Sequence, residues 1–408
     1  MGMDDSIYRI RNHDLLMLAL MALLGLSVVM VQSASASISG DFSFNLTDLA
    51  SKQLMFAGVG LVLFWVIRRT DYIHLLPGKN AILTAPPLWL MAIAAVACVA
   101  VLVPGIGIEK NGARRWLPLG IMQLQPSELA KWATVVFLAW WLTHRPINLD
   151  RFGNFVLTLV PIGFLCLLVV IQDFGTAALI AVVALGMMFV GRVKTWHLGV
   201  VLPPVMLAAY WFVAHKEYRW KRMTAFLDPY AAPQGEGYHM IQSLLSYATG
   251  GLSGTGLGGG IQKLGYLPED TTDFIFSTIC EELGFFGAAT VIGLYLMILI
   301  LAWQAMKQPR DAFGRLLGFG IGMMICTQAA INVAVATVSV PTKGLSLPLI
   351  SSGGSGLIIA CAAMGLLGSV LRHSHAPAPA RKPAKARKTA GAQAQPVGAK
   401  QWAEWTAA

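Results

Sequence analysis

The sequence contains little charge for its length. Only 12% of its 408 residues are Asp, Glu, Lys or Arg, whereas 56% are hydrophobic, and the mean hydropathy is +0.63. A soluble domain carries about twice that charged fraction. The deficit excludes a chain built from two or three ordinary soluble domains and predicts a single polytopic membrane unit.

Signals for disulfide, zinc and nucleotide sites are also missing. No CxxC pair occurs, and all five cysteines fall within apolar runs, which is typical of buried small hydrophobic residues: Cys98, Cys166, Cys280, Cys326 and Cys361. The stretch GTGLGG, from Gly254 to Gly259, matches a dinucleotide fingerprint in its letters alone. It lacks the flanking strand and helix of such a site, so we expect these glycines to permit tight turns and close backbone approach.

The chain has long apolar segments in abundance. A bilayer core requires roughly 20 apolar residues in a helix. By that rule the sequence contains about ten candidate transmembrane segments. They lie at Leu15–Ala34, Leu54–Ile67, Ile82–Val103, Leu129–Thr143, Phe155–Ile171, Thr176–Val190, Leu198–Ala214, Phe274–Trp303, Leu316–Val338 and Leu347–Leu371. The predicted fold is an all-α polytopic membrane protein with a large outer loop between the seventh and eighth transmembrane helices.

Positive charge is distributed unevenly between the connecting segments. Basic residues precede the first run and follow the second, fourth, sixth, eighth and tenth: Arg9, Arg11, Arg68, Arg69, Lys79, Arg145, Arg151, Arg192, Lys194, Lys307, Arg310, Arg315 and Arg372. If the spans alternate, these positions share one side, which we predict to be cytoplasmic and to hold both termini. We expect the first run to be retained as a transmembrane helix rather than cleaved as a signal peptide.

The C-terminal segment differs in composition from the rest of the chain. Residues 373–408 are rich in Ala, Pro and Lys and offer little to bury. We therefore predict a transmembrane domain over residues 1–372 and a disordered, basic cytoplasmic tail over residues 373–408. The basic residues of the tail are expected to lie against anionic lipid of the inner leaflet.

The predicted outer loops carry positive charge against the general rule, which indicates either an anionic ligand or anionic lipid headgroups. The stretch NGARRWLPLG places Arg114, Arg115 and Trp116 together. Two arginines can clamp phosphate oxygens with forked donors, and a tryptophan can stack on a sugar. The alternative for Trp116 is an anchor at headgroup depth.

The stretch YLPEDTTDFIFSTICEELG, from Tyr266 to Gly284, gathers five carboxylates. Glu269 and Asp270 fall in the outer loop and suit solvated acids. Asp273 lies at the membrane boundary directly before an apolar run, where it would point into any cavity that opens outward, or cap the following helix. Glu281 and Glu282 lie about two turns deeper, so at least one of them should have a polar partner.

Polar residues at three other helix ends are further candidates. Glu128 and Lys131 are spaced i, i+3, so they can pair with each other or line a polar cavity. Asp173 falls in a short turn between two apolar runs, where we favour a helix N-cap over catalysis. Lys343 faces the predicted outer side, and the serines and glycines from Ser351 to Gly356 could line a cavity with backbone donors.

Together these motifs resemble the SEDS family (shape, elongation, division and sporulation) of bacterial integral-membrane peptidoglycan glycosyltransferases. The matching pieces run along almost the whole chain: VVMVQSAS, NGARRWLPLGIMQLQPSELAK, QDFGTA, QSLLSYATGGLSGTGLGGGIQKLGYLPEDTTDFIFSTICEELGFFG and PTKGLSLPLISSGGSG. The versions MVQSAS, QKLGYLPE and PTKGLSLPLIS are more similar to the cell-division member of the family than to the elongation member.

The resemblance implies polymerisation of lipid II, a disaccharide-peptide on undecaprenyl pyrophosphate, at the outer face of the bacterial cytoplasmic (inner) membrane. It also implies that the family's essential aspartate is Asp273. The sequence departs from the family pattern at four residues. Thr271 replaces a usual His, Ser352 and Gly356 replace the Tyr and final Ser of SYGGSS, and Gln172 stands where Pro often precedes the Asp. The first departure puts a catalytic role for that His in doubt and leaves the Asp in place.

In the implied chemistry, Asp273 is the general base that accepts a proton from the acceptor sugar hydroxyl. The candidate substrate-binding residues are Arg114, Arg115, Trp116, Glu128, Lys131, Glu269, Thr272, Lys343 and Ser351. The basic members of this set could offset negative charge on the pyrophosphate leaving group. A divalent cation, Mg²⁺ or Mn²⁺, bridging Asp273 and pyrophosphate fits this chemistry, although no ligand cluster in the sequence points to one.

Three other functions stay open from the sequence. A flippase or transporter for lipid-linked precursors would need a polar path through the bilayer, for which Glu281 and Glu282 are the candidates. The others are a non-catalytic scaffold of a division complex and an elongation polymerase. The partners implied by the resemblance are lipid II, membrane lipids, a class B penicillin-binding protein that supplies transpeptidation, and other divisome proteins. No nucleic-acid partner is expected.

Overall fold

The computed structural model describes residues 11–39, 49–76, 84–110, 113–120, 122–144, 149–215, 217–235, 237–307 and 311–373. A helix forms in each of the apolar runs, which confirms the predicted all-α class. These helices are α1 (Asn12–Ser39), α2 (Leu49–Arg69), α3 (Pro86–Leu102), α4 (Pro126–His144), α5 (Phe152–Val170), α6 (Phe174–Val190), α7 (Thr195–Ala214), α10 (Ile275–Lys307), α11 (Ala312–Ala336) and α12 (Gly354–His373).

The length and composition of these helices fit a multi-pass membrane protein. Seven of them, α1, α2, α5, α7, α10, α11 and α12, are long and apolar enough to cross a bilayer. The apolar helices α3 and α6 are shorter, with 17 residues each. Helix α4 carries Glu128 and Lys131 near its start. The polytopic character is confirmed, and the number of spans stays a prediction.

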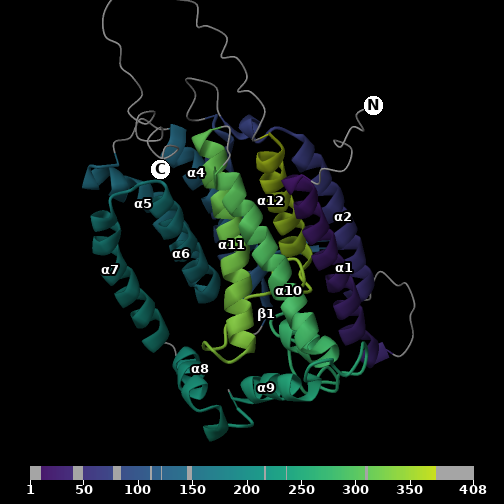
Figure 1. Ribbon diagram of the computed structural model, residues 1–408. Coiled ribbons are helices and arrows are strands. Elements are labelled where there is room, and N and C mark those ends of the chain that lie inside the picture. Colours follow the sequence, from purple (N-terminus) through teal and green to yellow (C-terminus); the bar gives the residue numbers. More distant parts are fainter. Residues whose placement is uncertain are drawn as a thin grey trace, which may run out of the picture.

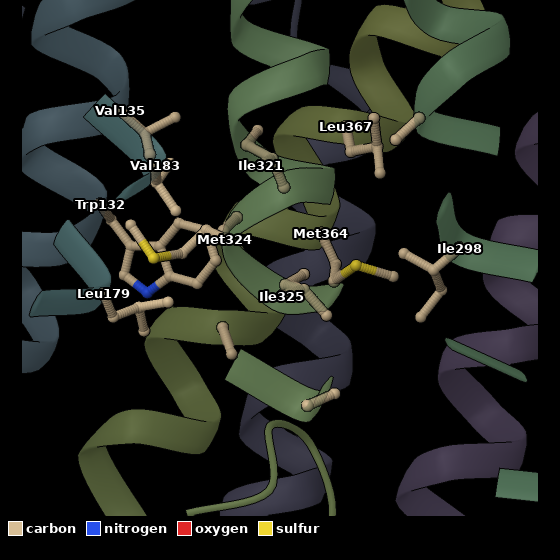
Figure 2. Close-up of a cluster of buried hydrophobic side chains, with 14 of the residues drawn as sticks. Trp132, Val135, Leu179, Val183, Ile298, Ile321, Met324, Ile325, Met364 and Leu367 are labelled. Atoms are coloured by element: carbon tan, nitrogen blue, oxygen red, sulfur yellow. The ribbon is translucent and has the colours of Figure 1, made fainter. Parts of the chain in front are cut away.

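Helix α11 runs through the middle of the bundle and packs against α4, α6, α10 and α12 (Figure 1). Figure 2 shows Ile321, Met324 and Ile325 of α11 between Trp132 on one side and Met364 on the other, and all five side chains are buried. Helix α7, in contrast, lies at the edge of the bundle, with His197 as its single buried residue. An apolar helix with so little contact to its own chain presents its side chains to lipid.

One end of the bundle joins the start of α1 to the ends of α2 and α12. Arg68 Nη2 lies 3.0 Å from Asp14 Oδ1. Ser369 Oγ of α12 donates to the Thr70 carbonyl at 2.6 Å and accepts from the Tyr72 N–H at 3.1 Å, at the 3₁₀ turn η2 (Tyr72–Leu75). The first and last described helices therefore share an end, which we predicted to be cytoplasmic. The tail residues 374–408, Arg9, Lys79, Arg145 and Arg310 lie outside the described residues.

A small antiparallel sheet follows α3, in the order β1 (Ile108–Lys110), β2 (Ala113–Leu119) and β3 (Met122–Leu124). Trp116 pairs with Ile108, and Leu117 pairs with Leu124. The sheet is tied to α12, because Ser355 Oγ accepts a hydrogen bond from the backbone N–H of residue 125 at 3.2 Å. The sequence Arg114-Arg115-Trp116 is thus held on a strand rather than in an open loop.

The large loop between α7 and α10, which we predicted to lie on the outer side, contains α8 (Glu217–Leu227), the 3₁₀ turn η3 (Pro229–Ala231) and α9 (Tyr238–Gly250). Helix α9 covers the stretch YHMIQSLLSYA, whose apolar spacing is helical. Figure 1 shows α8 and α9 at the end of the bundle opposite to that at which α12 finishes. The expected large loop between the seventh and eighth apolar runs is therefore a folded cap on one end of the bundle.

The glycine-rich part of this loop packs closely on α10. Gly254 has a φ of +79°, and a β-carbon there would lie 2.1 Å from the Glu282 carbonyl oxygen. Gly284, with a φ of +64°, kinks α10 at the same place. Glu281 Oε1 accepts the backbone N–H groups of Ile261 at 2.8 Å and Gln262 at 3.2 Å. The interpretation of these glycines as tight turns and close-approach positions is confirmed.

Glu282 binds the same loop through charge. Its carboxylate accepts hydrogen bonds from Lys263 Nζ at 2.7 Å, from Ser33 Oγ of α1 at 2.7 Å and from the Gly258 N–H at 3.2 Å. Both Glu281 and Glu282 have no exposed surface. The expectation of a polar partner for at least one of these acids is confirmed for both.

The start of the last helix differs from the prediction. The apolar run was predicted from Leu347, whereas α12 begins at Gly354. Residues 345–353 instead form a loop, in which Leu349 has a φ of +67°. Apolar composition cannot distinguish a buried loop from a helix, and here side chains from other helices satisfy the carbonyl groups of the loop.

Candidate active site

A cavity of about 540 Å³ lies between the sheet, the starts of α2, α4 and α12, the segment before α10 and the loop before α12. Eight of the ten residues that we predicted for the site line it: Arg115, Trp116, Glu128, Lys131, Glu269, Thr272, Asp273 and Ser351. The other two, Arg114 and Lys343, lie outside its walls. Residues far apart in sequence therefore converge on one cavity at the same end of the bundle as α9.

Asp273 lies in the turn that leads into α10, and it does not cap that helix. The N-cap position belongs to Phe274, whose carbonyl accepts the N–H of Thr278 at 3.3 Å. The Asp273 carboxylate lies against the backbone of Gly344, where an added β-carbon would be 3.1 Å from Oδ2. The Asp273 carbonyl accepts a hydrogen bond from Asn332 Nδ2 at 2.8 Å. The backbone is thus held while the carboxylate faces the cavity.

The surroundings of Asp273 favour its neutral form. Burial raises the pKa of Asp273 to about 7, and the nearby Glu269 and Asp173 carboxylates add to the rise. The positive charges of Arg115 and Arg222 act in the opposite direction on the same pKa. A carboxylate with a pKa near neutrality can accept a proton in a transition state and release it afterwards.

Asp173 occupies the N-cap position of α6. Its Oδ1 accepts the Thr176 N–H at 3.1 Å, and its Oδ2 accepts the Thr176 hydroxyl at 2.6 Å. The capping interpretation is therefore confirmed. The same residue lines the cavity, so its negative charge also acts on Asp273.

Arg115 projects into the cavity from β2. Its Nε is buried and has no hydrogen-bond partner among the described residues. A buried guanidinium donor without an acceptor is destabilising, so this arrangement suits an anionic ligand that would supply the missing oxygen. Trp116, the next residue of the strand, also lines the cavity and offers an aromatic face to a sugar.

Glu128 and Lys131 of α4 form the expected pair and line the cavity as well. Lys131 Nζ lies 2.7 Å from Glu128 Oε1 and 2.6 Å from Gln328 Oε1 of α11. Gln328 in turn donates to the Ser346 carbonyl at 2.8 Å. With an exposed fraction of 1%, Lys131 is a fixed charge in the wall rather than a mobile surface lysine.

Side chains from four helices hold the loop before α12 by its carbonyl groups. The donors are Ser27 of α1 to Ile350, Gln53 of α2 to Ser351, Tyr295 of α10 to Pro348, and Gln328 and Asn332 of α11 to Ser346 and Leu345. Ser351 also uses its own hydroxyl, which donates to the Thr272 carbonyl at 2.6 Å and accepts the Leu347 N–H at 2.7 Å. The loop is therefore a rigid wall, and Ser351 joins it to the Asp273 segment.

Arg114 and Lys343 have other surroundings. Arg114 Nε pairs with Glu109 Oε2 at 3.3 Å across the exposed face of the sheet. Lys343 Nζ lies 4.9 Å from the centre of the Phe174 ring, and burial lowers the pKa of Lys343. The pairing of β1 with β2 is irregular here, because Ile108 pairs with Trp116 and Glu109 with Arg114, so Arg115 has no residue of β1 directly opposite. Arg115 and Trp116 both line the cavity, whereas Arg114 does not.

Sequence reasoning missed several polar residues of the site, including four on α2 and α11. Lys52 and Gln53 of α2 line the cavity, as does Gln328 of α11, while Asn332 contacts the Asp273 backbone. The signal for the last two was present, because polar side chains four residues apart in an apolar run share a helix face and mark a functional interior.

The described residues contain no group of three or more His, Cys, Asp or Glu side chains that could hold a metal ion. A cation at Asp273 would therefore have to take most of its ligands from substrate oxygens and water. The residues do not fit a protein-built metal centre, and the divalent cation stays a prediction.

Comparison with known proteins gives a consistent result. A family model for FtsW, RodA and SpoVE, described as "Cell cycle protein", matches residues 14–376. Relatives named probable peptidoglycan glycosyltransferase FtsW include one from Thioalkalivibrio sp. (strain K90mix), 36% identical over 94% of this chain and 96% of its own. Another, from Nitrosococcus halophilus (strain Nc4), is 38% identical over 90% of this chain and 94% of its own.

Solved structures share the fold. A chain from a study of "Structural coordination of polymerization and crosslinking by a peptidoglycan synthase complex" superposes with a TM-score of 0.71 and 31% identity, covering 88% of this chain and 98% of that one. The rod shape determining protein RodA of Thermus thermophilus superposes with a TM-score of 0.62 and 27% identity, covering 88% of this chain and 96% of its own.

Proposed function

Because the chain belongs to the FtsW/RodA/SpoVE family of cell cycle proteins, we propose that it is a peptidoglycan glycosyltransferase with Asp273 as its general base. Its substrate is lipid II, which it polymerises into glycan strands at the outer face of the cytoplasmic membrane. The relatives named for this transferase activity match nearly the whole chain, so the activity is assigned to the chain as a whole rather than to a part.

The single observation that carries this proposal is the presence of a candidate base and a candidate anion-binding cation in one cavity. Asp273 contributes a carboxylate whose pKa is raised to about 7, and Arg115 contributes a buried Nε without an acceptor among the described residues. Glycosyl transfer from a pyrophosphate needs both a base for the attacking hydroxyl and a cation for the leaving group. The cavity supplies both.

The proposed step is a displacement at the anomeric carbon of the donor sugar. The acceptor hydroxyl oxygen forms the new glycosidic bond, while the bond from that carbon to the pyrophosphate oxygen breaks and its electron pair leaves with undecaprenyl pyrophosphate. The hydroxyl proton passes to Asp273. Arg115, Lys52 and Lys131 surround the region in which negative charge grows on the leaving group. Trp116 provides a surface on which a sugar ring can stack.

The biological setting is proposed to be cell division. The FtsW-named relatives are 36–38% identical, compared with 27% for the superposed RodA, which favours a division role over the elongation alternative. One superposed chain comes from a complex that couples polymerisation to crosslinking, which supports a class B penicillin-binding protein and other divisome proteins as partners. The chain would lie in the inner membrane with both termini in the cytoplasm.

Transport of lipid-linked precursors is the weaker alternative. It depended on Glu281 and Glu282 as the polar residues of a path, but both carboxylates are engaged by the outer loop, and Glu282 is neutralised by Lys263. A translocation path needs polar groups that are exposed to it, whereas neither carboxylate has any exposed surface. Lipid II translocation into vesicles that hold the purified protein, compared with empty vesicles, would test this alternative directly.

The deciding experiment is glycan synthesis from purified lipid II in detergent, for wild type and Asp273→Ala, each with and without a cognate class B partner. Polymer from wild type and none from the variant would support both the activity and the base. Equal polymer from both would keep the activity and move the base to another carboxylate, with Glu269 the next to test. No polymer from either would count against the activity.

The same assay also tests the divalent cation. Polymer yield would be measured after removal of metals with a chelator and again after addition of Mg²⁺ or Mn²⁺. A cation that bridges Asp273 and pyrophosphate predicts loss and recovery of activity. Unchanged yield in chelator would leave Arg115 and the cavity lysines as the groups that balance the pyrophosphate charge.

A further inference from the structure

Asn332 is a polar residue in the packed interior of α11, with an exposed fraction of 1%. Its side-chain amide donates two hydrogen bonds. One goes to the Asp273 carbonyl at 2.8 Å and the other to the Leu345 carbonyl at 2.7 Å. A single planar group therefore joins the segment before α10 to the loop before α12.

These two segments meet at the proposed base. The Asp273 carboxylate lies against Gly344, next to the residue that Asn332 holds on the loop side. Because the space for a β-carbon at Gly344 is only 3.1 Å from Asp273 Oδ2, a small shift of either segment would change the direction of the carboxylate. Asn332 fixes the separation of the two segments and does not itself line the cavity.

The choice of asparagine here is poor for stability alone. Its Oδ1 is buried and has no hydrogen-bond partner among the described residues. Leaving a buried acceptor unsatisfied destabilises a protein, so the oxygen of this side chain does not explain its presence. The side chain is therefore explained by its two donors, both of which are used on the walls around Asp273.

We propose that Asn332 is a positioning residue for the Asp273 carboxylate in glycosyl transfer, an inference that rests on the proposed function. It does not touch substrate. By holding Asp273 and the Gly344 loop at a fixed distance, it aims the base at the acceptor hydroxyl. Misplacement of a catalytic group by about 1 Å is enough to lower a rate about 100-fold.

The test compares Asn332→Leu, Asn332→Gln and Ser369→Ala with wild type, using full-length protein and purified lipid II. Asn332→Leu keeps the branching and the number of heavy atoms and removes both donors, while Asn332→Gln keeps both donors on a side chain one methylene longer. Ser369 is the matched control, because it is fully buried and joins two segments by hydrogen bonds at the opposite end of the bundle. Initial rates are measured over a range of lipid II concentrations.

We expect kcat of Asn332→Leu to fall between 10-fold and about 100-fold, with KM within about twofold of wild type. Asn332→Gln should recover part of the loss, and Ser369→Ala should keep the wild-type kcat. A merely structural role would lower the fraction of active protein in each variant in proportion to its loss of thermal stability. Because Asn332→Leu leaves the Asp273 and Leu345 carbonyl groups without this donor, Tm is measured for every variant and kcat is expressed per folded protein.

An Asn332→Leu kcat within about twofold of wild type would overturn the inference, as would a Ser369→Ala loss equal to that of Asn332→Leu. If the leucine variant did not fold, Asn332→Ala, which cannot overpack the site, would take its place with the same expectation. Absence of polymer from wild type would count against the proposed function instead, so the two failures are distinguishable.

Discussion

The cavity around Asp273 and the cluster around Glu281 and Glu282 are built from acids of one short stretch, yet they differ in how the carboxylates are bound. Glu281 and Glu282 are fully buried, and backbone N–H groups, Lys263 and Ser33 occupy their oxygens. Asp273 has a fixed backbone, a carboxylate that faces the cavity and a pKa raised to about 7. A buried carboxylate whose oxygens accept several hydrogen bonds holds segments of the chain together. A carboxylate that accepts none from the protein is available for chemistry.

The largest expected effect lies on the cavity side of this comparison. Asp273→Asn keeps the size of the side chain and removes the base, so kcat for glycan synthesis should fall by about 10²–10⁴-fold. The protein should fold, because Asn332 binds the backbone carbonyl of residue 273 rather than its side chain. The measurement is the initial rate of polymerisation of purified lipid II.

Asp270→Asn is the matched control for that variant. Asp270 is three residues away, burial raises its pKa to about 6, and it does not line the cavity. The kcat of the Asp270→Asn variant should stay near that of wild type. Equal losses in Asp270→Asn and Asp273→Asn would mean that the whole turn, rather than one carboxylate, carries the effect.

Substitutions in the buried cluster around Glu281 and Glu282 should lower the stability of the protein. Glu282→Ala leaves the Lys263 charge buried without its partner, which costs about 3–5 kcal/mol of unfolding free energy. Thermal unfolding in detergent would measure this as a lowered Tm. Glu217→Ala removes an exposed partner of Lys221 at 2.8 Å and should leave Tm unchanged. An unchanged Tm in Glu282→Ala would contradict a structural role for the ion pair between Glu282 and Lys263.

Arg115 and Arg114 provide a test of the sheet geometry. Arg115→Leu removes the cation that faces the cavity and should lower kcat/KM for lipid II about 10- to 100-fold, the value of a charge-assisted contact of about 1.5–3 kcal/mol. Arg114→Leu removes a pair with Glu109 on the exposed face and should have a smaller effect. A larger loss of kcat/KM in Arg114→Leu than in Arg115→Leu would instead indicate that Arg114 binds the substrate.

The smallest expected effect is a shift in pH dependence. If Asp273 must be ionised to act as a base, kcat/KM should rise with pH through a midpoint near 7. Glu269 and Asp173 raise the pKa of Asp273, while Arg115 and Arg222 lower it. Removing a neighbouring negative charge makes ionisation easier, so Glu269→Gln should lower the midpoint by up to about one pH unit, and Asp173→Asn by less.

Asp173→Asn suits this test because asparagine also caps helices well, so α6 should keep its start. The rate is measured from about pH 5 to 9 at subsaturating lipid II, a range that brackets the expected midpoint. A midpoint that moved upward in Glu269→Gln would contradict the assignment of the acid limb to Asp273.

Much of the architecture was predictable from composition and spacing. Each of the ten apolar runs contains a helix in the structure, since burial in lipid requires the backbone to satisfy its own hydrogen bonds. The i, i+3 spacing of Glu128 and Lys131 predicted their ion pair, and the position of Asp173 predicted its cap. Each of these features depends on neighbours within one turn of helix.

The division of roles among the remaining polar residues was not predictable in the same way. Arg114 and Arg115 are adjacent and identical, and the irregular pairing of β1 with β2 accompanies the placement of Arg115, but not Arg114, in the cavity wall. The loop before α12 is as apolar as a helix, but donors from four other helices hold it open.

The sequence by itself determined the membrane class, the helices, the outer loop and the residue types of the site, because hydropathy and local spacing are properties of the chain. Only the tertiary structure decided that the carboxylates of Glu281 and Glu282 are held by hydrogen bonds while that of Asp273 faces the cavity. That decision depends on whether Lys263, Ser33 or a backbone N–H from a distant segment reaches a given carboxylate. Contacts between residues far apart in the chain leave no periodic trace in the sequence.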